Sequence, residues 1–149
     1  MRVIIATDGT SLSVGAATRA LEVLHPETQF TLATAYEPVE YDGTGFAGPT
    51  VSEEEFDELE QERRLEAETA LTKTAAALGI VGAEHAMLPG DPGPAICKLA
   101  EDQHAHVIVI GSHGWGPIKR AVLGSVSEYV IHHAPCPVLV VSAEAAGEG

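Results

Sequence analysis

The sequence predicts an open α/β fold in which a five-stranded parallel sheet is sandwiched by helices. Two observations support this prediction. Five short apolar runs alternate along the chain with longer segments that begin with helix-capping residues. The runs are almost continuously apolar, which is typical of strands buried on both faces of a parallel sheet. Right-handed crossovers between such strands place helices on either side of the sheet.

The first expected elements are a strand, a polar turn, a helix and a second strand. Val3–Ala6 is an unbroken apolar run, and the small residues Thr7–Ser11 follow it as a turn. Ser11 is a good N-cap residue, so we expect a helix from there to about Leu24. The run Gln29–Tyr36 is the second predicted strand.

A long loop and a long helix fill the middle of the chain. Glu37–Val51 is interrupted by prolines and glycines, and this composition predicts a mobile loop whose length indicates a function. Ser52-Glu53-Glu54-Glu55 matches a capping box, so a helix is expected to begin there and to end before Gly79. Acidic residues dominate the first half of this helix, which is therefore expected to face solvent.

The remaining elements continue the alternation up to a short tail. Asp91 and Pro92 combine an N-cap residue with a proline that suits the first position of a helix. The expected elements are a strand at Gly82–Leu88, a helix from Asp91 to Gln103, a strand at Val107–Ile110, a helix from Ser125 to about His133 and a strand at Val138–Val141. We expect a single domain over residues 1–142 and a disordered tail over residues 143–149.

The composition of the 149-residue chain limits its functions. Its formal net charge is −14, from 22 acidic residues against 8 lysines and arginines, and such a field repels nucleic acids. Cys97 and Cys136 are too few for a disulfide framework or a zinc site, so we expect both to be reduced, buried and inert. No apolar run approaches the roughly 20 residues of a membrane span, and the first residues do not resemble a signal sequence. We therefore expect a cytoplasmic protein that binds neither nucleic acid nor membrane.

A pattern of glycine and serine follows the strand predicted at Val107–Ile110. Gly111-Ser112-His113-Gly114 comes directly after this strand, and Gly124-Ser125 follows nine residues later. Glycines allow the backbone to approach a ligand closely. Ser125-Val126-Ser127-Glu128 matches a capping box, and a helix beginning there would point its N–H groups and positive end toward the glycines. The pattern predicts a phosphate-binding site, with the alternative that Gly111 and Gly114 only shape a turn and Ser125 only caps its helix.

Asp8, directly after the first strand, extends this prediction. Ligands of open α/β sheets bind beyond the carboxyl ends of the strands, where the strand order reverses. If the first strand neighbours the strand at Val107–Ile110, Asp8 and Gly111 line one crevice. Because the chain is strongly acidic, phosphates there would need local N–H donors, a nearby cation such as Lys119 or Arg120, or Mg²⁺.

These motifs resemble those of the universal stress protein family. Its nucleotide-binding branch carries Gly-x2-Gly-x9-Gly-(Ser/Thr) after the fourth strand, and Gly111, Gly114, Gly124 and Ser125 match that spacing. The resemblance covers nearly the whole chain. Further matches occur at Ile4–Thr10, at Gly90-Asp91-Pro92 and at Ala134–Val141. The resemblance implies an open Rossmann-like fold of the adenine nucleotide α-hydrolase type, and a site for ATP with or without Mg²⁺.

The resemblance also implies a role for each matching residue. Asp8, with Thr7 in the same motif, matches the aspartate that contacts the nucleoside, although it could instead only cap its turn. Ala35 matches a second-strand position, often valine, whose backbone contacts adenine. The loop beside ribose and phosphates corresponds to Gly111, His113 and Gly114, and the turn that holds the β- and γ-phosphates corresponds to Gly124, Ser125, Val126 and Ser127. Arginine is also common at the position of His113, whose own charge would depend on pH.

By resemblance, we expect an ATP-binding regulatory or stress-response module. Its nucleotide state would change the Glu37–Val51 loop, or a dimer surface, for an unidentified protein partner. The family usually forms homodimers, and Pro137–Ser142 would be an edge strand able to pair with a second copy. The sequence contains no Ser-His-Asp order, metal triad or P-loop motif, so we expect little or no turnover. Two alternatives remain open: a slow ATPase or autophosphorylating enzyme, and a stress-linked interaction protein that binds no nucleotide.

Overall fold

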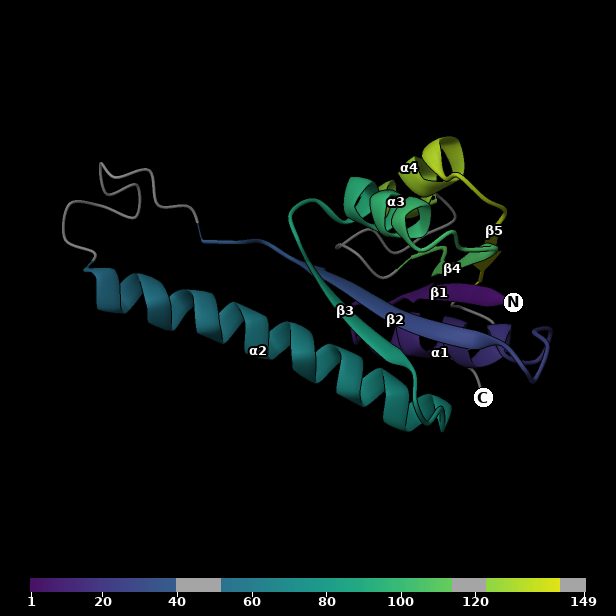
Figure 1. The fold of residues 1–149 in the computed structure, drawn as a ribbon, viewed down its shortest axis with the longest axis horizontal. Helices are drawn as coiled ribbons and strands as arrows, with labels where there is room; N and C mark the ends of the chain where they lie inside the picture. Colours follow the sequence, from purple (N-terminus) through teal and green to yellow (C-terminus); the bar gives the residue numbers. More distant parts are fainter. Residues whose placement is uncertain (40–51, 114–122, 143–149) are drawn as a thin grey trace.

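The computed structural model describes residues 1–39, 52–113 and 123–142, and it has the predicted α/β architecture (Figure 1). Five parallel strands form one sheet in the order β3-β2-β1-β4-β5. The elements are β1 (Arg2–Ala6), α1 (Ser11–Ala20), β2 (Gln29–Tyr36), α2 (Glu53–Leu78), β3 (Glu84–Pro89), α3 (Pro92–Asp102), β4 (Val107–Gly111), α4 (Ser125–His133) and β5 (Val138–Val141). The predicted fold class is confirmed. Most of the predicted middle loop and the predicted tail lie outside the described residues.

Alternate residues of the strands pack against helices on opposite faces of the sheet. In β1, Val3 and Ile5 belong to the core shared with α1 and α2, whereas Ile4 and Ala6 belong to the core shared with α3 and α4. Figure 1 shows the same layers, with α1 and α2 on one side of the sheet and α3 and α4 on the other. Burial on both faces explains why the strand sequences are continuously apolar.

The strand order reverses beside β1, as the predicted crevice requires. β1 pairs with β2 on one side and with β4 on the other, where Ile5 lies opposite Val109. The carboxyl ends of β1 and β4 therefore lie next to each other. Asp8 follows the first of these ends, and Gly111 is the last residue of the second. The condition under which Asp8 and Gly111 line one crevice, that these two strands are neighbours, is met.

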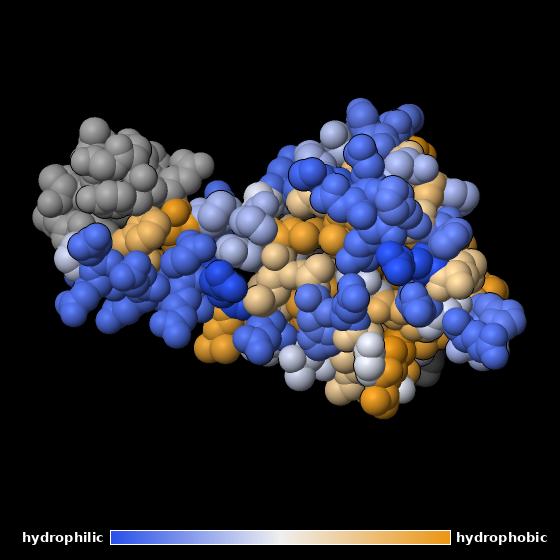
Figure 2. Space-filling view, in the orientation of Figure 1, coloured by the Kyte–Doolittle hydropathy of each residue, from blue (hydrophilic) through white to orange (hydrophobic). Residues whose placement is uncertain are grey.

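Helix α2 extends well beyond the sheet. Its predicted capping box is present: Ser52 Oγ accepts the N–H of Glu55 at 3.2 Å, and Glu55 Oε2 accepts the N–H of Ser52 at 3.0 Å. The buried residues of α2 all lie in its second half, namely Ala67, Leu71 and Thr74. Figure 1 shows the first half projecting away from the sheet, and Figure 2 shows the visible face of this half to be mostly hydrophilic. The predicted solvation of the acidic first half agrees with this arrangement.

The ends of α1 differ from the prediction. Thr10, rather than Ser11, is the N-cap, because its Oγ1 accepts the N–H of Ser13 at 3.3 Å. The helix ends at Ala20 rather than at Leu24. From Glu22 to Leu24 the N–H groups bond to carbonyls three residues back, in tighter turns that end the α-helical pattern.

Helix α3 begins as predicted and packs closely on α4. Asp91 occupies the N-cap position and Pro92 the first helical position, although the Asp91 side chain makes no capping bond. Gly93 allows the close packing, since a Cβ at this position would lie 2.8 Å from the Tyr129 ring. Gly93 therefore supports the contact between two helices of the same face.

Candidate functional site

Asp8 accepts three hydrogen bonds on one of its carboxylate oxygens. Oδ1 accepts the N–H of Thr10 at 2.9 Å, the hydroxyl of Thr10 at 2.5 Å and the hydroxyl of Ser13 at 2.7 Å. The turn-capping role that the sequence left open for Asp8 is therefore present. None of the described residues donates a hydrogen bond to Oδ2. This second oxygen is able to accept a hydrogen bond from a ligand, so the two roles of Asp8 are compatible.

Thr7, which the prediction included in the site, has its side chain enclosed between β1, α1 and α2. The residue is fully buried, and its Oγ1 lies 2.9 Å from Thr74 Oγ1 of α2 and 3.1 Å from Ser13 Oγ. Its N–H donates to the Ala33 carbonyl at 2.9 Å. The Thr7 hydroxyl thus belongs to the packing between β1 and α2, and a contact with a ligand would come from the main chain.

Ala35 directs its main-chain N–H and C=O groups toward the space beyond the carboxyl end of β1. Successive residues of a parallel strand point their N–H and C=O groups alternately to the two neighbouring strands. The Ala33 carbonyl accepts from Thr7 on the β1 side, and the Tyr36 carbonyl accepts from Gly90 on the β3 side. Ala35 therefore points its N–H and C=O toward the β1 side, beyond the last residue of β1.

A main-chain hydrogen bond joins the end of β4 to the start of α4. The N–H of Gly124 donates to the Ser112 carbonyl at 2.8 Å. The Ser127 hydroxyl donates to the Gly124 carbonyl at 2.9 Å and also lies 3.3 Å from the Ser112 carbonyl. The N-cap of α4 is Gly124, in an extended conformation, so the predicted capping box that begins at Ser125 is wrong. Ser127 instead tightens the connection between strand and helix.

Gly111 and Gly124 both lie where a larger residue would be crowded. A Cβ on Gly111 would be 3.1 Å from the His113 carbonyl oxygen and 3.2 Å from Ala16 Cβ. A Cβ on Gly124 would be 3.1 Å from the Ser112 carbonyl oxygen. Both glycines thus have a role in shaping the turns, which for Gly111 is what the alternative interpretation held. Gly114, Lys119 and Arg120 lie outside the described residues.

The first turn of α4 presents N–H groups that fit an anion. Ser125, Val126 and Ser127 are its first three residues, and the first bond of the helix joins the Glu128 N–H to the Gly124 carbonyl at 2.9 Å. Within the described part of the chain, no side chain caps the helix and nothing accepts from the N–H groups of residues 125–127. These donors coincide with the positive end of the helix dipole, an arrangement that suits a phosphate.

Two residues that the sequence did not predict support the turn between β1 and α1, residues 7–10, which we call the Asp8 turn. Ser13 and Thr74 are both buried polar residues, from α1 and α2. A signal was present for Thr74, because it occupies the same buried stripe of α2 as Ala67 and Leu71. A polar residue in such a stripe indicates a buried hydrogen bond. Ser13 carried no comparable signal, since serines in the first turn of a helix are common.

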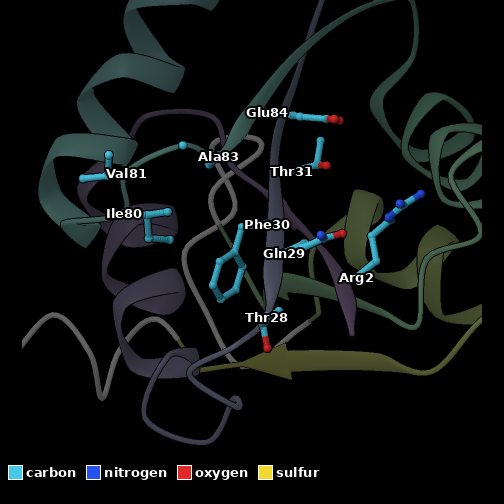
Figure 3. Close-up of a pocket in the computed structure, with 10 residues that line it drawn as sticks. Arg2, Thr28, Gln29, Phe30, Thr31, Ile80, Val81, Ala83 and Glu84 are labelled. Atoms are coloured by element: carbon cyan, nitrogen blue, oxygen red, sulfur yellow. The ribbon is translucent and has the colours of Figure 1, made fainter.

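A hollow of about 480 Å³ lies at the other end of the sheet (Figure 3). It is next to the start of β2 and β3, so it is separate from the predicted crevice. Figure 3 shows Phe30 and Ile80 on the α2 side of β2, and Arg2 and Glu84 on the opposite side. Gln103 bonds to both of these charged residues, through its carbonyl to Arg2 at 2.9 Å and through its amide to Glu84 at 3.3 Å. The charged groups of the hollow therefore already have a protein partner.

The two cysteines lie in the core that α3 and α4 share with the sheet. Both are free; Cys97 is buried, whereas Cys136 is only half-buried, less than predicted. Burial raises the pKa of both thiols, and the charge of Cys136 raises that of Cys97 further. Among the residues that the structure describes, no cluster of acidic, histidine and cysteine side chains is suited to a metal ion. None of the described helices combines the length and apolar character needed to cross a bilayer.

Comparison with known proteins identifies the family of the chain. The model of the universal stress protein family matches residues 1–142. A universal stress protein of Thermus aquaticus is 34% identical over 145 residues, which cover 93% of this chain and 96% of the relative. The solved structure of MJ0577 from Methanocaldococcus jannaschii has a TM-score of 0.74 at 27% identity, and the match covers 95% of this chain and 94% of that chain. A universal stress protein solved in complex with cAMP has a TM-score of 0.62 at 26% identity, with coverages of 96% and 97%. The chain therefore belongs to the universal stress protein family.

Proposed function

We propose that this protein binds an adenine nucleotide, with ATP as the preferred ligand, at the carboxyl ends of β1 and β4. The observation that carries the proposal is the group of N–H donors at residues 125–127, at the same end of the sheet as the Asp8 carboxylate. The N–H groups suit a phosphate, and the carboxylate suits a hydroxyl or amino group of the nucleoside. A family member of similar fold forms a complex with cAMP, which supports an adenine nucleotide as the ligand.

Each part of the nucleotide has a candidate partner. Asp8 Oδ2 would accept from the nucleoside, and the main chain of Ala35 would contact adenine. The phosphates would bind the N–H groups of residues 125–127, with Gly111, His113 and Gly124 in the adjoining turns. Gly114, which lies outside the described residues, is proposed as part of the same site by the sequence motif alone. Mg²⁺ would be held mainly by the phosphates and water, as is common for this ion. Its two positive charges would also offset the repulsion from a chain of net charge −14.

The site is better suited to holding a nucleotide than to cleaving it. Asp8 Oδ1 is occupied by three donors, and the Ser127 hydroxyl bonds to the Gly124 carbonyl. We therefore assign a regulatory function with little or no turnover. The state of the site would be transmitted toward the loop after β2, whose first residues contact α2. The Val39 N–H donates to Glu60 at 2.9 Å, and Arg63 donates to the Glu37 carbonyl at 2.8 Å.

Ser125→Pro tests the assignment of the phosphate donors. Proline removes one N–H group but suits the first helical position, and the extended Gly124 before it is compatible with a following proline. We expect Ser125→Pro to weaken ATP binding about tenfold, as for the loss of one hydrogen bond to a charged group. Titration calorimetry with and without Mg²⁺ measures this affinity, and Ser125→Ala serves as the control that keeps the N–H. Binding of adenosine, which lacks phosphates, should be unaffected by either substitution.

Three results would contradict the proposal. Wild-type protein that binds no adenine nucleotide, and releases none on acid extraction, would support an interaction protein instead. Equal ATP affinity of Ser125→Pro and wild type would place the phosphates elsewhere. Phosphate release above background that Asp8→Ala abolishes would support a slow ATPase.

A further inference from the structure

A buried chain of hydroxyl groups connects Asp8 to helix α2. Thr74 Oγ1 lies 2.9 Å from Thr7 Oγ1, which lies 3.1 Å from Ser13 Oγ, and Ser13 Oγ lies 2.7 Å from Asp8 Oδ1. Thr7 and Thr74 are completely buried, and Ser13 is 2% exposed. The chain spans β1, α1 and α2, and it ends on the carboxylate that the proposed nucleotide site uses.

The hydrogen bonds of this chain have a direction. The Thr74 hydroxyl donates to the Ala70 carbonyl at 2.8 Å, so its oxygen accepts the proton of Thr7. The Thr7 oxygen in turn accepts the Gly9 N–H at 3.1 Å. The Ser13 hydroxyl is then left to donate to Asp8 Oδ1, while its oxygen accepts the Asp8 N–H at 3.2 Å. With these directions neither Thr7 nor Ser13 donates to the other, so the 3.1 Å approach of their oxygens is a contact without a shared proton.

A second contact holds the same turn against the same part of α2. Gly9 has a φ of +79°, and a Cβ at this position would lie 2.8 Å from Ala70 Cβ. Ala70 is also the residue whose carbonyl accepts the Thr74 hydroxyl. The Asp8 turn therefore rests on one turn of α2, through a close contact at Gly9 and a hydrogen bond at Thr7.

We propose that Thr74 is a positioning residue for the nucleotide site. By accepting the proton of Thr7, Thr74 keeps that proton away from Ser13 Oγ, and the Ser13 hydroxyl stays bound to Oδ1 of Asp8. Oδ2 of Asp8 is then left for the ligand. This inference rests on the proposed function for the part that concerns the nucleotide. Without the Thr74 oxygen, the Thr7 hydroxyl turns to its remaining neighbour, Ser13 Oγ, and disturbs the bonds that fix the carboxylate.

Thr74→Val, which keeps the shape and removes the hydroxyl, tests the role of Thr74. We expect ATP affinity to fall about fivefold to tenfold, the range for one lost hydrogen bond. Thr74→Ser restores the hydroxyl and should bind as wild type, and Thr72→Val, at an exposed position of the same helix, is the matched control. In a protein that already carries Asp8→Asn, Thr74→Val should lower ATP affinity little further, because the carboxylate that Thr74 positions is already lost. An equal loss in both backgrounds would overturn the inference.

Hydrogen exchange of the ligand-free protein separates this inference from the proposed function. The Thr10 N–H donates to Asp8 Oδ1, so its exchange should become faster in Thr74→Val and remain slow in Thr74→Ser. Unchanged exchange in Thr74→Val would overturn the positioning role even if ATP binds. If wild type binds no ATP, the proposed function fails, and the exchange of Thr10 still decides whether Thr74 holds the Asp8 turn.

Discussion

The N–H of Gly124 donates to the carbonyl of Ser112 at 2.8 Å, and this bond joins the start of α4 to the end of β4. The consequence is that the first turn of α4 is held at the carboxyl end of the sheet. Its N–H groups then lie at the end of the strand that neighbours β1 and Asp8. A contact between two main-chain groups thus determines where the anion-binding part of the site lies.

Gly124→Ala should disturb this contact. The added Cβ would lie 3.1 Å from the Ser112 carbonyl oxygen, so strand and helix must separate by a few tenths of an ångström. We expect weaker ATP binding in titration calorimetry. Phe30→Ala is the control, because it removes a partly buried side chain at the opposite end of the sheet and should lower stability while leaving affinity unchanged. Equal affinity losses in the two variants would show that the effect is general destabilisation.

Asp8→Ala should reduce stability as well as nucleotide binding. Oδ1 accepts three hydrogen bonds in the turn before α1, and we expect the loss of this acceptor to cost about 1–2 kcal/mol of the free energy of unfolding. Asp8→Asn keeps an acceptor oxygen and should cost less. Urea denaturation measures both values. Unchanged stability in Asp8→Ala would mean that the turn does not depend on the carboxylate.

The two cysteines predict a pH dependence of stability. Burial raises their pKa values above the ordinary 9.0, so the folded protein keeps thiol protons that the unfolded chain loses above about pH 9. The contribution of these groups to stability is therefore constant below that pH and falls as the pH rises toward the raised values. A Cys97→Ala/Cys136→Ala variant should show a smaller fall between about pH 8 and pH 10 in urea denaturation. The same fall in both proteins would contradict the role of the thiols.

Ser52→Ala should loosen the start of α2 without unfolding the protein. The substitution removes the Ser52 hydroxyl from the capping box, an effect of about 1 kcal/mol on the helix. The first half of α2 contains no residue classed as buried, so this cost should appear as faster amide exchange near residues 53–56 and not in global stability. A clear drop in the unfolding midpoint would show that the projecting half supports the rest of the fold.

The proposed homodimer depends on β5, which is an edge strand of the sheet. An apolar edge of this kind exposes unpaired main-chain groups that a second copy is able to pair. We expect light scattering coupled to size-exclusion chromatography to give about twice the chain mass of 15.6 kDa. A mass equal to one chain at high protein concentration would remove this part of the account.

The fold could be predicted from the sequence because its strongest signals are local. The apolar runs and the Ser52 capping box depend on neighbouring residues. The pairing of β1 with β4 could only be assumed, because it joins strands that lie far apart in the sequence. Helix ends were less predictable. Ser125 matches a capping box in sequence, but Gly124 already bonds to Ser112 and takes the N-cap position, which is a tertiary effect.

The candidate site could be predicted in part. Asp8 and the residues after β4 were recognised because small and polar residues follow the strands. The orientation of Thr7 was not predicted, since it depends on Thr74, which lies 67 residues away in the chain. Likewise, the packing of Gly111 against Ala16 depends on the position of α1 against the sheet. Contacts of this kind follow from the assembled fold and leave little trace in the local sequence.

The most direct test of the account is an NMR titration of the protein with ATP, followed through the backbone amide signals. If the nucleotide binds at the carboxyl ends of β1 and β4, the largest shifts should occur at Asp8, Ala35, Gly111 and residues 125–127. The amides around Gln103 and Val81, beside the hollow in Figure 3, should move little. Shifts concentrated at that opposite end of the sheet, or no shifts at millimolar ATP, would contradict the account.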